Sequence, residues 1–135
     1  MSESAIGSKK EEAMKHIVTF LQTKKPEEAI PFYRDVLGFN YLRDDGFALV
    51  FDMDGVMLRI GKAKEFTAAP GTVLGWEAED ICTAVDELVA KGVTFERYSF
   101  MQQDERGIQT FPGGDRVAWF KDPDGNVLSI SHHTQ

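Results

Sequence analysis

The chain has 135 residues, of which 42% are hydrophobic, and it carries one cysteine and a formal net charge of −7. A chain of this length buries roughly 68% of its unfolded surface, which is enough for a stable core without disulfides. The acidic balance opposes a nucleic-acid partner, which needs a dense basic patch. No apolar run approaches the roughly 20 residues of a membrane helix, and no secretory signal is present, so we expect a cytoplasmic protein without a membrane partner.

The N-terminal part of the sequence contains a polar arm and a strand. Residues 1–14 (MSESAIGSKKEEAM) carry charged and small polar side chains without a hydrophobic period, so we expect them to lie outside the core. From residue 15 the segment KHIVTFLQT alternates between two sets of side chains, which predicts a strand. His16 and Phe20 share one face of this strand, because side chains two residues apart point the same way.

A helix and three short strands follow in the first half of the chain. Pro26 suits the first turn of a helix, and Gly38 can take the left-handed conformation that ends one. Pro31 lacks a backbone donor, so either the first turn is irregular or the helix starts later. Asp-Gly pairs, which are typical of hairpin turns, then separate three strand-like segments, namely residues 39–43, 47–51 and 56–60.

The second half repeats this order after an aperiodic linker over residues 62–71. Residues 72–78 predict a strand, and Asp80 predicts the N-cap of a second helix. We expect another strand over residues 93–100 and a long loop over residues 101–114. Structureless loops of this length are often functional, so this loop is a candidate lid over a cavity.

A hairpin closes the chain, VAWFKDPDGNVLSIS, in which the Pro-Asp-Gly sequence predicts a tight turn. Alternation places four apolar side chains on one face of the hairpin: Ala118, Phe120, Leu128 and Ile130. The opposite face combines a large aromatic ring with small polar groups: Val117, Trp119, Ser129 and Ser131. This second face suits the wall of a ligand cavity.

These patterns predict an α+β fold made of two tandem β-α-β-β-β modules within one domain over residues 15–135. The first module covers residues 15–61, the second covers residues 72–131, and residues 132–135 form a tail.

The doubled plan, together with FYRDVLGF at residues 32–39 and FKDPDGN at residues 120–126, resembles the vicinal-oxygen-chelate superfamily. That superfamily contains glyoxalases, bleomycin-resistance proteins and extradiol dioxygenases. The resemblance implies that the two modules form a curved mixed sheet, a half-barrel around a cavity that binds a small molecule. It also implies a homodimer.

Enzymes of this superfamily hold a divalent metal with His, Gln or Glu side chains from the first and last strands of each module. By this resemblance His16 matches the first ligand position, whereas the other positions hold Leu58, Val73 or its neighbour Thr72, and Ser129. A stable site needs at least three protein ligands. We therefore predict no metal cofactor.

Seven side chains make up the predicted ligand site: His16, Phe20, Phe51, Arg59, Phe100, Trp119 and Ser129. Trp119 can stack on a flat ligand, and His16 is either a hydrogen-bond donor or base in the pocket or a structural histidine bonded to the backbone. Arg59 either meets an anionic ligand or faces solvent or a partner subunit.

The sequence therefore predicts a glyoxalase/bleomycin-resistance-like protein that binds a small organic molecule without turnover, as sequestering resistance proteins do. The alternative is a lyase, isomerase or dioxygenase of the glyoxalase type. Such an enzyme would use an atypical metal set that includes His16, or metal-free acid-base chemistry by His16 and Glu77. A regulatory or scaffold module is a third possibility.

Overall fold

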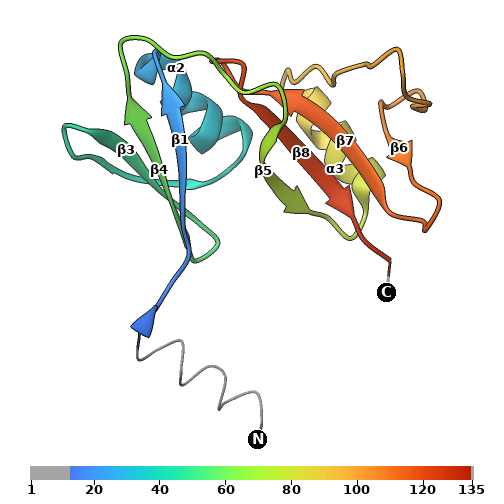
Figure 1. Ribbon diagram of the computed structural model, residues 1–135, viewed down its shortest axis with the longest axis horizontal. Coiled ribbons are helices and arrows are strands. Elements are labelled where there is room, and N and C mark those ends of the chain that lie inside the picture. Colours follow the sequence, from blue (N-terminus) through green and yellow to red (C-terminus); the bar gives the residue numbers. More distant parts are fainter. Residues whose placement is uncertain (1–12, 135) are drawn as a thin grey trace, which may run out of the picture.

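The computed structural model describes residues 13–134, which form two four-stranded sheets and a few short helices (Figure 1). The expected polar arm lies outside the described residues except for Ala13 and Met14. The elements follow the order β1 (Val18–Thr23), α2 (Pro26–Pro31), η1 (Phe32–Val36), β2 (Asn40–Asp44), β3 (Ala48–Met53), β4 (Val56–Lys62), β5 (Thr72–Glu77), α3 (Ile81–Ala90), β6 (Gln109–Thr110), β7 (Arg116–Lys121) and β8 (Val127–His132). No helix in this described part is long and apolar enough to cross a membrane.

The two sheets have the same topology, which confirms the predicted α+β fold of two repeated modules. The strand order is β1-β4-β3-β2 in the first sheet and β5-β8-β7-β6 in the second. In each sheet the first strand of the module pairs in parallel with the last, and the remaining pairs are antiparallel. The sheets lie side by side and open, with β1 and β5 between them (Figure 1).

The first helix begins at Pro26, so the expectation of a later start is wrong. The irregularity predicted for its first turn lies instead after Pro31. Pro31 cannot donate a backbone hydrogen bond, and the chain continues as the π-helix η1. The amide of Leu37 donates to the carbonyl of Phe32 over 3.0 Å, five residues back. Gly38, with φ of +80°, then ends the helix as predicted.

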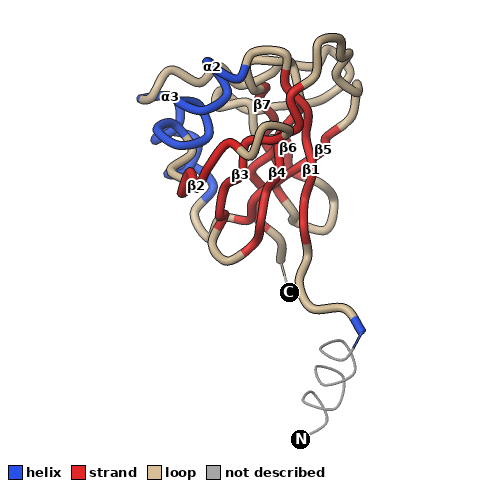
Figure 2. Tube along the Cα trace, turned by 90° about the vertical axis from the view of Figure 1, so that its left-hand side faces the viewer, coloured by secondary structure: helices blue, strands red, loops and turns tan. Residues whose placement is uncertain are grey.

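Alternation along the strands gives each sheet one buried face. In the first sheet the register places Leu21, Leu58 and Phe51 on the same face, and all three are buried. Tyr33 of η1 packs against this face, with its ring 5.7 Å from that of Phe51. The helices cover one side of the sheets (Figure 2), so the opposite side, called the open face below, has no helix over it.

The second sheet packs in the same way under α3. The side chain of Asp80 accepts a hydrogen bond from the amide of Thr83 over 3.1 Å, so it is the predicted N-cap. The four apolar side chains that alternation placed on one face of the hairpin are all buried: Ala118, Phe120, Leu128 and Ile130.

The prediction of a strand over residues 93–100 is wrong. Only Phe95 forms an isolated bridge, to Phe120, and the short strand of this region is β6, inside the segment expected to be loop. The side chain of Gln103 explains the difference. Its amide nitrogen donates to the carbonyls of Glu96 and Gly107, and its oxygen accepts from the amide of Tyr98, so it occupies the backbone groups that a strand would have paired.

The β7–β8 turn joins the two modules. The buried carboxylate of Asp122 accepts a hydrogen bond from the Tyr33 hydroxyl over 2.7 Å, and burial next to this carboxylate raises the pKa of Tyr33 well above its ordinary value. Asn126 donates to the carbonyl of Gln22 over 3.1 Å, and the hydroxyl of Thr23 donates to Asp124. The predicted turn therefore also fixes β1 against the second module.

Candidate functional site

The open face carries exposed apolar side chains where the two sheets meet. Phe20 is 70% exposed on β1, and Val73 is 41% exposed on β5. With Phe66 of the linker and Asn126 of the turn, they line a cavity of about 270 Å³. Apolar surface of this kind between two sheets is typical of a ligand site or an interface.

Trp119 and Ser129 stand opposite each other on β7 and β8, as the hairpin pattern predicted. Ser129 is 8% exposed and lies beside Gly75 of β5, its partner in the parallel pair. A side chain at Gly75 would overlap with the Ser129 hydroxyl, so the glycine leaves the room that this serine needs. The centre of the second sheet on the open face thus consists of Gly75 and the Ser129 hydroxyl, called the polar spot below, beside the half-buried indole of Trp119.

A row of three aromatic rings connects Trp119 to Phe100 through Tyr98. The ring of Tyr98 meets Trp119 edge to face at 5.8 Å, and the ring of Phe100 lies 5.6 Å from Tyr98. Burial raises the pKa of Tyr98, and the nearby Glu96 carboxylate adds to this effect. Phe100 is 79% exposed at the end of the row. The predicted ligand site included Trp119 and Phe100 but missed Tyr98. The position of Tyr98 two residues before Phe100 could have indicated it.

Arg59 lies on the open face, since it pairs across the sheet with Phe20. Its guanidinium lies 2.7 Å from the carboxylate of Asp45, with both side chains 28% exposed. The Arg59 hydrogen bond, together with the amides of Phe47 and Ala48, holds the pKa of Asp45 well below its usual value. Arg59 therefore already has an anionic partner within the chain, and a ligand would have to share or displace it.

Three other predicted residues lie apart from this region. His16 is exposed and precedes β1 instead of standing in it; it lines a separate cavity of about 270 Å³ with Asp52 and Met57. Phe51 borders the same cavity as His16, but its side chain has no exposed surface and packs in the core, away from Trp119 and Ser129. Glu77 is exposed at the end of β5, opposite Ser131.

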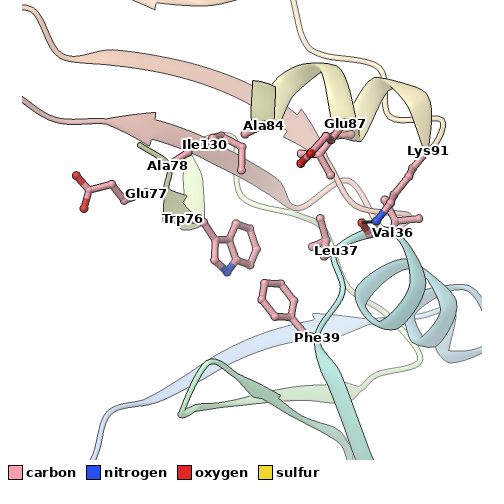
Figure 3. A pocket seen from close by; sticks show the side chains of 11 residues that line it. Val36, Leu37, Phe39, Trp76, Glu77, Ala78, Ala84, Glu87, Lys91 and Ile130 are labelled. Carbon is pink, nitrogen blue, oxygen red and sulfur yellow. Dashed lines mark hydrogen bonds between the residues drawn. The ribbon is translucent and has the colours of Figure 1, made fainter. Parts of the chain in front are cut away.

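A further hollow of about 260 Å³ lies on the helix side, between η1, β5 and α3. Trp76 and Phe39 stack at its base with their ring centres 5.3 Å apart, and Leu37, Ala84 and Glu87 surround them (Figure 3). Trp76 thus packs toward the helices, on the opposite side of the second sheet from Trp119. This hollow is separated from Trp119 by the second sheet.

A family model described as the Glyoxalase/Bleomycin resistance protein/Dioxygenase superfamily matches residues 13–130. The chain belongs to this superfamily. The match covers nearly all the residues that the structure describes, and it confirms the resemblance drawn from the repeat and the two motifs. A comparison with curated protein sequences finds no match.

Solved structures of the superfamily share the fold. TnmS3, an antibiotic binding protein from Streptomyces sp. CB03234, is 24% identical with a TM-score of 0.67, and the match covers 90% of this chain and 98% of that one. A superfamily member from Sphaerobacter thermophilus is 22% identical with a TM-score of 0.69, over 90% and 99% of the two chains. Lactoylglutathione lyase from Agrobacterium tumefaciens is 20% identical with a TM-score of 0.67, over 88% and 93%.

The residues at the superfamily's metal positions do not fit a divalent ion. The assignment of Leu58 to the position on β4 is wrong, because Leu58 is fully buried on the helix side; its neighbour Arg59 faces the open side. A guanidinium, Val73 and Ser129 offer no set of metal ligands with His16. Within residues 13–134 no group of three or more His, Cys, Asp and Glu side chains is placed to hold a metal ion.

Proposed function

We propose that this member of the superfamily binds a small, flat organic molecule on the open face and sequesters it without the superfamily's metal. The observation that supports this proposal is the chemistry of the open face, where Arg59, Val73 and Ser129 stand on β4, β5 and β8, strands whose counterparts carry metal ligands in the superfamily's enzymes. A cation and an apolar side chain disfavour a divalent ion but leave a surface suited to an organic molecule. We place this activity in the cytoplasm.

The aromatic row supports a flat ligand. Trp119 presents ring surface next to the small Ser129, and Phe100 stands exposed at the other end of the row, beyond Tyr98. A planar molecule that lies against these rings gains both apolar burial and stacking. The likeness to TnmS3, described as an antibiotic binding protein, agrees with a ligand of this kind.

A second copy of the chain completes the proposed site. Val18, Phe20 and Val73 are exposed on the open face of a single chain, at 41%, 70% and 41%. A homodimer in which the open faces of two chains meet would bury these side chains and enclose the ligand. The ligand would then contact Phe20 of one chain and Trp119 of its partner, or both residues of one chain.

Tryptophan fluorescence tests the ligand site directly, because the chain has only two tryptophans, one on each side of the second sheet. A panel of planar polycyclic compounds is added to the Trp76→Phe variant, which reports Trp119, and to the Trp119→Phe variant, which reports Trp76. We expect saturable quenching in the first variant only. Saturable quenching confined to Trp76, with both variants folded by circular dichroism, would contradict a ligand on the open face.

A further inference from the structure

Three side chains at the end of β8 form a connected row that the proposed binding site does not use. The hydroxyl oxygen of Ser131 lies 2.9 Å from Nε2 of His133, and Nδ1 of His133 lies 3.1 Å from the carboxylate of Asp115. Asp115 directly precedes β7, whose pairing of Arg116 with His132 brings it beside the end of β8.

The hydrogen bonds fix where the protons lie in this row. A carboxylate only accepts hydrogen bonds, so Nδ1 of His133 carries the proton that Asp115 receives. In the neutral imidazole Nε2 is then left with a lone pair, and it accepts the hydrogen of the Ser131 hydroxyl. This is the proton arrangement of a serine whose hydroxyl is deprotonated during attack.

Asp115 is held in place by the chain that follows β8. One carboxylate oxygen accepts hydrogen bonds from the amide of Thr134 over 2.9 Å and from its hydroxyl over 3.2 Å, while the other faces His133. The Thr134 amide and the His133 ring lower the pKa of Asp115. The carboxylate is therefore ionised at neutral pH and can orient the imidazole.

In a single chain a solute can reach this row. Ser131 stands on the open face in phase with Ser129, opposite Val117 on β7, and is half-buried. The side chains of His133 and Asp115 are 49% and 42% exposed. A molecule that lies along the open face can therefore place a carbonyl carbon at the Ser131 oxygen.

We propose that Ser131 is a nucleophile with His133 as its general base and Asp115 as the positioning residue, and that it accepts acyl groups from activated esters or thioesters. This proposal goes beyond ligand sequestration and does not depend on it. The three side chains supply a nucleophile, a base and an orienting carboxylate, but no donor for a developing oxyanion. The leaving group must therefore be a good one.

The reaction balances without a further cofactor. The Ser131 oxygen forms a bond to the acyl carbon while its proton moves to Nε2 of His133. The ester C–O or thioester C–S bond then breaks, and the alcohol or thiol leaves with that proton. Water adds to the acyl-serine by the same route, which releases the carboxylic acid and restores the Ser131 hydroxyl.

The 135-residue chain is tested with p-nitrophenyl acetate. Release of p-nitrophenol is followed by absorbance, and the acetyl group is located by peptide mass spectrometry. We expect acetyl on Ser131, loss of this label in Ser131→Ala, and hydrolysis slowed about 100-fold in Ser131→Ala and His133→Gln. Asp115→Asn should lower kcat with KM unchanged, because Asp115 acts through the imidazole and does not touch the substrate. His132→Gln is the matched control, since His132 bonds the Ala78 carbonyl over 3.0 Å instead of Ser131.

An exposed histidine alone can also hydrolyse this ester, so the serine variant decides the outcome. Hydrolysis at the wild-type rate by folded Ser131→Ala, or acetyl found on other residues and not on Ser131, would overturn the proposal. Neither result depends on the quenching of Trp119, so failure of the acylation and failure of the binding proposal are distinguishable.

Discussion

Gly75 is the residue on which the polar spot beside Trp119 depends. An added Cβ would overlap with the Ser129 hydroxyl and lie 3.2 Å from the Ser129 carbonyl oxygen. We expect Gly75→Ala to lower the free energy of unfolding by about 1–3 kcal/mol in urea denaturation, as overpacking does. Addition of Ser129→Ala should restore part of the loss, because it removes the overlapping oxygen. Gly71→Ala is the control, since nothing lies within 4 Å of a side chain there; an equal loss in both alanine variants would contradict this account.

Tyr33 links the two modules through a single buried hydroxyl. We expect Tyr33→Phe to lower the free energy of unfolding by about 1.5–3 kcal/mol, because it removes a hydrogen bond to the charged Asp122. The pKa of Tyr33 is raised in the folded state, so its stabilising effect is complete below about pH 10, where an unfolded tyrosine stays protonated, and is lost as the pH rises above that value.

Denaturation of the wild type and of Tyr33→Phe between pH 8 and pH 11 checks this dependence. The fall of wild-type stability above about pH 10 should be shallower in the variant. Tyr41→Phe is the control, because Tyr41 packs on Phe51 without contacting Asp122. A wild-type curve parallel to that of Tyr33→Phe would show that this hydroxyl is not the group responsible.

Single residues also show the limit of prediction from sequence. Alternation correctly placed Trp119 and Ser129 opposite each other, because the tight turn fixes the register of that hairpin. The family resemblance failed for Leu58, because a shift of one residue exchanges the two faces of a strand, and the register against β1 depends on contacts between distant segments.

Among the elements, the segment that follows α3 departs furthest from its sequence pattern. Residues 93–100 contain enough apolar and aromatic side chains to predict a strand, yet Gln103 holds them as an irregular edge. Strand propensity cannot reveal that a side chain takes the place of a neighbouring strand, since the hydrogen-bond partner here is the single side chain of Gln103 in the following loop. The helices were predictable because proline, the Asp80 cap and the glycine stops act locally.

Gln103→Ala should release this edge without unfolding the sheets. Loss of the three Gln103 hydrogen bonds leaves the amide of Tyr98 open to solvent. We expect hydrogen exchange at the Tyr98 amide to accelerate at least about tenfold, while the amides of β7 and β8 keep their protection. Gln102→Ala, at the exposed neighbouring position, should have no effect. Unchanged exchange at Tyr98 in Gln103→Ala would contradict the bracing role of this side chain.

The whole molecule has an open face that a single chain leaves uncovered. The repeat predicted two modules of equal topology, but not their side-by-side arrangement, which depends on the contacts of Tyr33 and Asn126 with the other module. This arrangement leaves Phe20 exposed at the junction of the two sheets. The proposed homodimer follows from that exposure.

Sedimentation velocity tests the dimer. We expect a dimer for the wild type and a monomer for Phe20→Asp, because a charged carboxylate in place of this ring would have to leave water for the interface. Phe47→Asp is the matched control, since Phe47 is 81% exposed in the β2–β3 turn and does not stand on β1 or β5, where the sheets meet. A wild-type monomer at micromolar concentration, or dissociation caused equally by both variants, would contradict this interface.

We propose that the open face binds an organic molecule without a metal. Isothermal titration calorimetry with the compound that quenches Trp119 most strongly tests it, on protein treated with a chelator and on protein supplied with zinc, manganese or nickel. We predict the same Kd in all four samples, and a Kd at least about tenfold weaker for Trp119→Ala. Binding that appears only when a divalent metal is supplied would contradict the claim.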